Sequence, residues 1–130
     1  MMVNKFGLAS LFLTDRHRGL GDFANMIRLA VYRVRPDKLD RLKAWLIEVA
    51  QRPDEVRESF AEGGITHEQA QLIVTADGPM LVAAVEHTDR QMVSESSRRS
   101  TLPLNVEHEA VMAEVLDGVV ETTVLLDFRD

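Results

Sequence analysis

The segment 80–85 (MLVAAV) is apolar at every position, which is typical of a β-strand that is buried on both sides. Successive side chains of a strand point to opposite faces of the sheet, so this strand predicts a sheet that is covered on both faces. The other elements that the sequence predicts are too few to cover both faces. We therefore expect a second copy of the chain to cover the face that the helices leave open.

The elements around this strand follow the order strand, helix, strand, strand, helix, strand. Alternating apolar and polar residues complete the set of strands, predicted at 27–35, 69–75, 80–85 and 119–129. Apolar spacings of three and four predict helical segments after Asp37, at 54–62, at 90–99 and at 105–116. This order is typical of a ferredoxin-like βαββαβ fold of class α+β, an antiparallel sheet with its helices on one face.

Local signals mark where several of these elements begin and end. Asp37 and Asn105 are the expected N-caps of two helices, because their side chains can accept bonds from free backbone amides. Gly63 and Gly64 are expected to end a helix, since glycine adopts the left-handed conformation at little cost. The turn signal at 77–79 (DGP) is expected to join two strands into a hairpin.

Residues 26–130 are predicted to form one domain, and residues 1–25 an N-terminal tail or an arm that packs on a neighbour. The net charge of −6 argues against nucleic acid and against membrane surfaces as partners. No stretch approaches the roughly 20 apolar residues that a membrane span needs. The absence of cysteine fits a reducing compartment, so we expect a cytoplasmic protein.

Four segments carry a resemblance to a known family: 68–71 (EQAQ), 77–79 (DGP), 86–89 (EHTD) and 100–108 (STLPLNVEH). With them, residues 26–129 resemble a bacterial family of unknown function within the dimeric α+β barrel group. The resemblance implies a small stand-alone ferredoxin-like domain that pairs two sheets face to face into a homodimer. The wider group includes cofactor-free monooxygenases, heme proteins, cyclases, isomerases and binding proteins, and a shared fold does not select among these activities.

Histidines and glutamates are the candidates for proton transfer. The hairpin brings the start of one strand near the end of the next, so Glu68 is expected to approach Glu86 or His87 across the ladder. His108 is expected at the start of the last helix, where the helix dipole lowers the pKa of a histidine. The predicted catalytic residues are His108 as proton carrier and Glu68 and Glu86 as its carboxylate partners. Solvated strand ends for the glutamates and a structural hydrogen bond for His108 are the open alternatives.

The predicted ligand-binding residues are His87, Tyr32, Trp45 and Phe60, which would line a pocket between sheet and helices. Trp45 is equally explained as a core residue. The histidine spacing matches no metal motif, so neither a metal nor another cofactor is expected. These features predict a homodimer that binds a small organic molecule, with an isomerase, cyclase or monooxygenase as its catalytic form. The alternative is a non-catalytic accessory or interaction protein.

Overall fold

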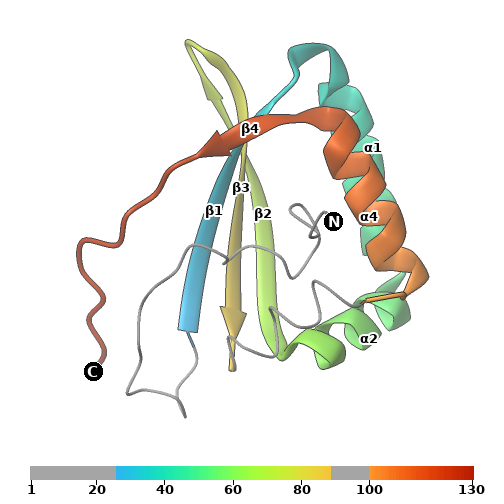
Figure 1. Cartoon of the computed structure of the whole chain (residues 1–130), viewed down its shortest axis with the longest axis vertical. Coiled ribbons are helices and arrows are strands. Elements are labelled where there is room, and N and C mark those ends of the chain that lie inside the picture. Colours follow the sequence, from blue (N-terminus) through green and yellow to red (C-terminus); the bar gives the residue numbers. More distant parts are fainter. Residues whose placement is uncertain (1–25, 89–99) are drawn as a thin grey trace.

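The computed structural model describes residues 26–88 and 100–130. Its elements are β1 (Met26–Val34), the 3-10 turn η1 (Pro36–Lys38), α1 (Leu39–Ala50), α2 (Pro53–Gly63), β2 (Ile65–Thr75), β3 (Gly78–His87), α4 (Pro103–Val115) and β4 (Leu116–Val120). The four strands form one antiparallel sheet in the order β2-β3-β1-β4, and the helices lie together on one side of it (Figure 1). The predicted ferredoxin-like α+β fold is confirmed. The helix predicted at 90–99 and the tail at 1–25 lie outside the described residues.

The two faces of the sheet have different surroundings, and we call the face that meets the helices the inner face and the opposite one the outer face. The inner residues of β1 are Arg28, Ala30, Tyr32 and Val34, all of them buried. The inner residues of β3 are Leu81, Ala83, Val85 and His87, which are also buried. The more apolar alternate set of β1, which includes Ile27 and Leu29, therefore points outward.

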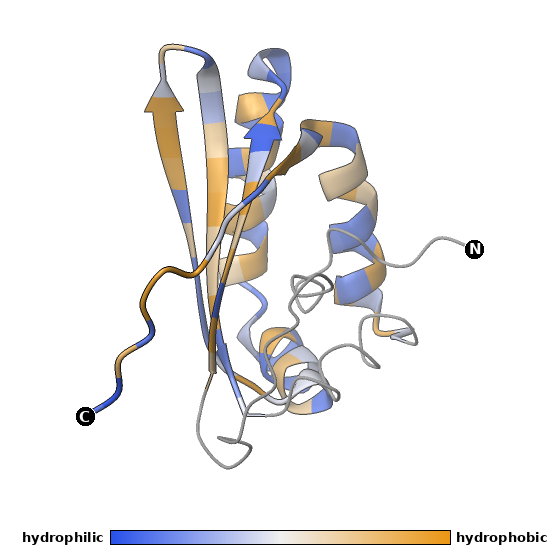
Figure 2. Cartoon of the chain, turned by 60° about the vertical axis from the view of Figure 1, so that its left-hand side comes forward, coloured by the Kyte–Doolittle hydropathy of each residue, from blue (hydrophilic) through white to orange (hydrophobic). Residues whose placement is uncertain are grey.

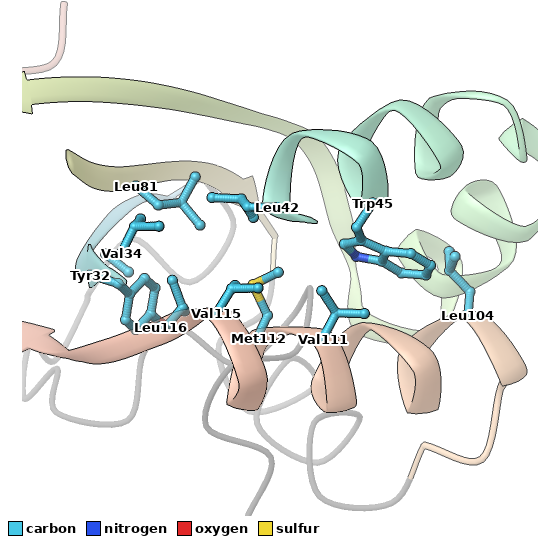
Figure 3. Close-up of a cluster of buried hydrophobic side chains, with 11 residues drawn as sticks. Tyr32, Val34, Leu42, Trp45, Leu81, Leu104, Val111, Met112, Val115 and Leu116 are labelled. Atoms are coloured by element: carbon cyan, nitrogen blue, oxygen red, sulfur yellow. The ribbon is translucent and has the colours of Figure 1, made fainter. Parts of the chain in front are cut away.

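The hydrophobic core fills the space between the inner face and helices α1 and α4 (Figure 3). Leu42 of α1 and Met112 of α4 are both 2% exposed. Trp45 of α1 faces α4, near Leu104 and Val111 (Figure 3). The core consists of Ala30, Tyr32, Val34, Leu42, Trp45, Leu81, Leu104, Val111, Met112, Val115 and Leu116. Burial of these side chains is the main term that holds the helices on the sheet, since a large aliphatic side chain contributes roughly 1.5–3 kcal/mol.

Two of the predicted helix ends are wrong. Asp37 lies inside the turn η1, and α1 starts after Lys38 without a side-chain cap. Asn105 is the third residue of α4, because that helix begins earlier, at Pro103. Proline is favoured at the first helical position, where its missing N–H is not needed. Gly64, by contrast, ends α2 in the left-handed conformation, with φ of 69°, as the sequence predicts.

Strand β2 starts at Ile65, four residues before the predicted position, and carries a β-bulge at its start. Ile65 pairs with His87, whereas His67 pairs with Glu86, so the register shifts by one residue between these pairs. A one-residue shift exchanges the faces of a strand. The bulge therefore turns Glu68, the next residue, to the inner face and His67 to the outer face.

Strand β4 ends at Val120, and the prediction of a strand over 119–129 is wrong for most of its length. Residues 121–130 form no strand although their sequence alternates, because they lie away from the sheet edge that would supply hydrogen-bond partners (Figure 1). Figure 2 shows that much of this segment is apolar. A pattern of alternation predicts a strand only where a neighbouring strand completes it.

The outer face is mainly apolar along β1 and β3 and polar along most of β2, and no described element covers it. Ile27 is 71% exposed, Leu29 is 53% exposed, and Ile73 of β2 is 45% exposed. Met80, Val82 and Ala84 lie between these residues on β3 and are half-buried. The structure thus explains why segment 80–85 is apolar throughout, since one set of its side chains enters the core and the other set joins this outer apolar surface.

Candidate functional site

The described inner face carries polar side chains toward the end of the hairpin opposite its turn. Glu68 of β2 pairs with Val85 of β3, and Val85 pairs with Arg28 of β1, so these three residues form one row across the inner face. His87 lies two residues beyond Val85 and has no exposed surface. Buried Arg and His side chains on a sheet face need compensating interactions, and both residues take part in further interactions.

The next row toward the hairpin turn consists of small residues. Ala70, Ala83 and Ala30 are in register on three adjacent strands, and we call them the alanine row. Ala83 and Ala30 are buried, whereas Ala70 is exposed. The alanine row therefore runs from an open surface at β2 to the buried centre of the sheet. Tyr32 follows Ala30 on the inner face, so Glu68 and Tyr32 flank the row from opposite ends.

Glu68 is the most perturbed carboxyl group of the described residues. Its side-chain oxygen Oε1 is inaccessible to solvent and has no hydrogen-bond partner within residues 26–88 and 100–130. Burial raises the pKa of Glu68 to about 8. The residue as a whole is half-buried, and Oε1 is the atom that solvent does not reach. Glu68 is therefore mostly protonated at neutral pH.

Tyr32 is electrostatically linked to this carboxyl. Burial raises the pKa of the Tyr32 hydroxyl above its ordinary range, and the charge of Glu68 raises it further. Glu68 and Tyr32 lie on β2 and β1, two strands that are separated by β3. Near neutral pH both groups therefore keep their protons.

His108 lies on α4 and is 5% exposed. The indole Nε1 of Trp45 donates a hydrogen bond of 2.8 Å to Nδ1 of His108. Burial lowers the pKa of His108 to about 4, so the ring is neutral at physiological pH. Since Nδ1 accepts, the neutral ring carries its proton on Nε2. The neutral imidazole agrees with the expectation from the sequence. Its cause is the burial of the His108 side chain, because His108 lies beyond the first turn of α4.

A second polar cluster connects α2 with α4. The Ser59 hydroxyl donates to Oδ1 of Asn105 at 2.8 Å, and Nδ2 of Asn105 donates to the hydroxyl of Ser100 at 2.8 Å. Ser59 and Asn105 are both buried. This chain of bonds fixes the start of α4, one helical turn before His108. The sequence analysis treated Asn105 as a cap and did not identify its partner Ser59.

Arg52 holds α1, α2 and α4 together at the surface. Its guanidinium contacts Glu48 at 3.0 Å and both Glu55 and Glu107 at 2.7 Å, and it lies over the Trp45 ring at 5.9 Å. The hydrogen bonds from Arg52 lower the pKa of Glu55 and of Glu107. Because Glu107 is engaged in this cluster, it does not share a site with its neighbour His108.

The polar chain from Ser59 to Ser100 leads to a prediction about stability. Asn105→Ala is expected to lower the free energy of unfolding by about 1–3 kcal/mol, because it leaves the buried Ser59 hydroxyl without its acceptor. Chemical denaturation of Asn105→Ala, Ser59→Ala and the double variant provides the measurement. If the two single losses simply add in the double variant, the hydrogen bond contributes no coupling and this account of the cluster is contradicted.

The structure brings together some of the sequence-predicted residues and separates others. Glu68, His87 and Tyr32 share the inner face. Glu86 pairs with His67 and points to the outer face, so one subunit cannot direct both Glu68 and Glu86 at the same ligand. Trp45 is a buried core residue and also the hydrogen-bond partner of His108. Phe60 is half-buried on α2.

Arg28 is an inner-face residue that the sequence analysis missed. It is 7% exposed and lies in the row of Glu68 and Val85. The signal was available in the alternation of β1, where Arg28 shares its face with Ala30 and Tyr32. It was hidden because the opposite set, which includes Ile27 and Leu29, is more apolar.

Two kinds of site or segment are absent from the described part of the chain. Residues 26–88 and 100–130 contain no group of three His, Asp or Glu side chains placed to hold a metal ion. Within the same residues, no helix is long and apolar enough to cross a membrane.

The sheet order and the single helical layer define a ferredoxin-like α+β domain. A solved structure from Bacteroides thetaiotaomicron, provisionally described as an antibiotic biosynthesis monooxygenase, has the same fold. Its TM-score is 0.51 at 18% identity, with 85% of this chain and 98% of that chain covered. A structure from Mycobacterium tuberculosis gives a TM-score of 0.49 at 24% identity, with 82% and 100% covered.

The chain belongs to the family of unknown function DUF6176, whose sequence pattern matches residues 26–130. This match confirms the predicted resemblance to a family of unknown function. Among curated proteins, none matches the chain significantly. At 18% identity, the Bacteroides structure supports the fold alone, and the activity has to be argued from the residues.

Proposed function

We propose that the protein binds a small, partly apolar organic molecule over the alanine row, between Glu68 and Tyr32. The observation that carries this proposal is the buried oxygen of Glu68, which has no hydrogen-bond partner among the described residues. Most buried polar atoms in folded proteins are satisfied, so an unsatisfied one needs an explanation. A ligand oxygen or nitrogen beside Glu68 supplies the missing partner.

The small side chains support this placement. Ala70, Ala83 and Ala30 have the smallest side chains after glycine and lie in one row across three strands, and Ala70 is exposed to solvent. A small-molecule site typically combines an apolar floor with a few polar groups that orient the ligand. The alanine row provides the floor, and Glu68 and Tyr32 provide the polar groups.

The site also supports acid–base chemistry without a cofactor. A carboxyl group with a pKa near 8 exchanges its proton readily at physiological pH, which is a property of general acids and bases. In the proposed catalytic form, Glu68 transfers a proton to or from the ligand while the Tyr32 hydroxyl stabilises the developing charge. We place His108 in a supporting role, because its Nδ1 already accepts from Trp45. Glu86 is not part of this proposal.

We further propose that the protein is a homodimer that buries the two outer faces against each other. Ile27, Leu29 and Ile73 form an exposed apolar surface that a symmetric partner covers. Sedimentation at micromolar concentration is expected to give a dimer. Leu29→Asp is expected to shift it to monomer, whereas Lys43→Asp on the exposed side of α1 serves as the control. A wild-type monomer would contradict this arrangement.

The ligand site is tested by a thermal-shift screen of small, partly apolar organic compounds. A compound present at 100 times its Kd stabilises the folded state by about 2.7 kcal/mol, which raises the Tm by several degrees. Compounds that stabilise the wild type are expected to lose most of this effect in Ala83→Leu, which fills the row, and in Glu68→Gln. They are expected to keep it in Glu86→Gln, which changes a carboxylate on the opposite face of the same hairpin.

The outcomes separate the two candidate functions. If Glu86→Gln abolishes the response while Ala83→Leu preserves it, the ligand does not lie over the alanine row. If no compound shifts the Tm and native mass spectrometry of protein from its own host shows no retained molecule, a non-catalytic interaction protein is favoured instead. A cytoplasmic location and the absence of a cofactor remain predictions from the sequence.

A further inference from the structure

The inner side of β2 is exposed over most of its length, whereas the inner residues of β1 and β3 are mostly buried. Beyond Glu68, the inner residues of β2 are Ala70, Leu72 and Val74, and all three are exposed. Leu72 is 39% exposed and Val74 is 73% exposed. Among residues 26–88 and 100–130, the helices thus leave an apolar strip open along β2. We call Ala70, Leu72 and Val74 the β2 strip.

The residue pattern of β2 favours its inner side as the side that is covered. The outer side carries Gln69 and Gln71, and Nε2 of Gln71 donates a hydrogen bond of 2.6 Å to Oε1 of Gln69. A strand with one face in water normally places its polar residues on that face. The inner side has no polar residue from Ala70 to Val74. An apolar partner is therefore needed on the helix side of β2, where no described element supplies one.

The β2 strip is continuous with the proposed ligand site. Ala70 belongs both to the strip and to the alanine row, and Glu68 precedes it on the same side of the strand. The solvent-inaccessible Oε1 of Glu68 has no hydrogen-bond partner among the described residues. At about 3.3 Å per residue, Leu72 lies about 13 Å and Val74 about 20 Å along the strand from Glu68. One polar atom that lacks a partner is thus followed by a long, narrow apolar surface.

We infer that the ligand is a fatty acyl compound with an uncharged carbonyl head, whose head meets Glu68 and whose alkyl chain lies along the β2 strip. An uncharged head fits because a second charge beside a buried carboxyl group would be costly to desolvate. An amide head supplies both an acceptor and a donor, so it can pair with a protonated carboxyl group through both of its oxygens. The inference rests on the proposed ligand site and names the class of compound that this site takes.

Titration calorimetry of the full chain with hexanamide and decanamide tests the inference. Hexanamide is long enough to reach Ala70, and decanamide is long enough to reach Leu72. The Kd is expected to fall about two- to fourfold for each added methylene group, since the strip covers the chain on one side. Leu72→Ser is expected to weaken the binding of decanamide about tenfold and to leave that of hexanamide unchanged. Gln71→Ser, on the outer side of the adjacent position, is the control and is expected to change neither Kd.

Equal Kd values for the two amides, or a Leu72→Ser variant that binds both as the wild type does, would overturn the fatty acyl class. If Leu72→Ser lowers the Tm of the ligand-free protein and leaves both Kd values unchanged, a segment of protein covers the strip instead. The proposed function survives these results if hexanamide, or another compound of the thermal-shift screen, binds the wild type and not Ala83→Leu. If no compound binds the wild type, both the fatty acyl class and the ligand site are contradicted.

Discussion

Between pH 6.5 and 8, the free energy of unfolding of the wild type is expected to fall with a slope of up to about 1.4 kcal/mol per pH unit. In this range the folded state keeps the proton of Glu68, whose pKa is about 8, while the unfolded state releases it. The unfolded state thus binds fewer protons, and raising the pH favours unfolding. The contribution of Glu68 is complete below pH 4.5 and is lost as the pH rises to 8.

His108 has the opposite effect at lower pH. Its folded pKa is about 4 and its ordinary value 6.5, so the unfolded state takes up a proton first as the pH falls. Stability from this group is full above pH 6.5 and is lost as the pH falls toward 4. Between pH 4.5 and 6.5 the two slopes therefore oppose each other, and the contributions of Glu68 and His108 nearly cancel.

Glu68→Gln separates these contributions, because glutamine keeps the size of the side chain and removes its titration. Urea unfolding at pH 5, 6.5 and 8 is expected to show no loss for this variant at high pH, and an uncompensated rise of stability from pH 5 to 6.5. Glu86→Gln, on the outer face, is expected to retain the wild-type profile. A Glu68→Gln profile that follows the wild type at all three pH values would show that the carboxyl is not held protonated.

Trp45→Ala is expected to lower the free energy of unfolding by about 3–5 kcal/mol. The indole is 3% exposed and contributes to the core between α1 and α4, so its removal leaves a large cavity. The substitution also removes the donor to Nδ1 of the buried His108. Chemical denaturation at pH 7 measures the loss, and Ile47→Ala on the same helix, where the side chain is 59% exposed, is expected to change stability by about 0.5 kcal/mol or less.

Trp45→Phe distinguishes packing from hydrogen bonding at the same position. Trp45→Phe keeps an aromatic ring but removes the N–H. It is expected to lower the free energy of unfolding by about 1–3 kcal/mol relative to the wild type, because one buried hydrogen bond and some volume are lost. A loss for Trp45→Phe as large as that for Trp45→Ala would indicate that the bond to His108 dominates. A loss near that of Ile47→Ala for both variants would contradict the placement of Trp45 in the core.

The order of elements could be predicted from the sequence because most of the apolar patterns have one dominant period, and segment 80–85 is apolar throughout. The apolar spacing of three and four after Asp37 and the alternation at 27–35 are local signals, and the structure has the corresponding helix α1 and strand β1. Strand 119–129 could not be predicted correctly, because a strand also needs a neighbour, and the pairing of β4 with β1 ends at the Val31–Val120 pair. The same limit applies to Asn105, whose partner Ser59 is 46 residues away.

The candidate site was predictable only in part. The hairpin register placed Glu68 near His87, but the bulge after Ile65 decides which residues of β2 face inward, and nothing in the local pattern marks it. Sequence reasoning therefore grouped Glu68 with Glu86, which lies on the other face. The inner position of Arg28 and the alignment of three alanines across three strands depend on pairings between distant segments.

The most direct test of the proposed site is a carbon-13 NMR titration of the Glu68 side-chain carboxyl, assigned by its loss in Glu68→Gln. The arrangement of buried oxygen, alanine row and Tyr32 predicts a midpoint near pH 8 in the ligand-free protein. A midpoint near the ordinary value of 4.5 would show a solvated carboxylate, and the proposed proton-exchanging site would then be contradicted.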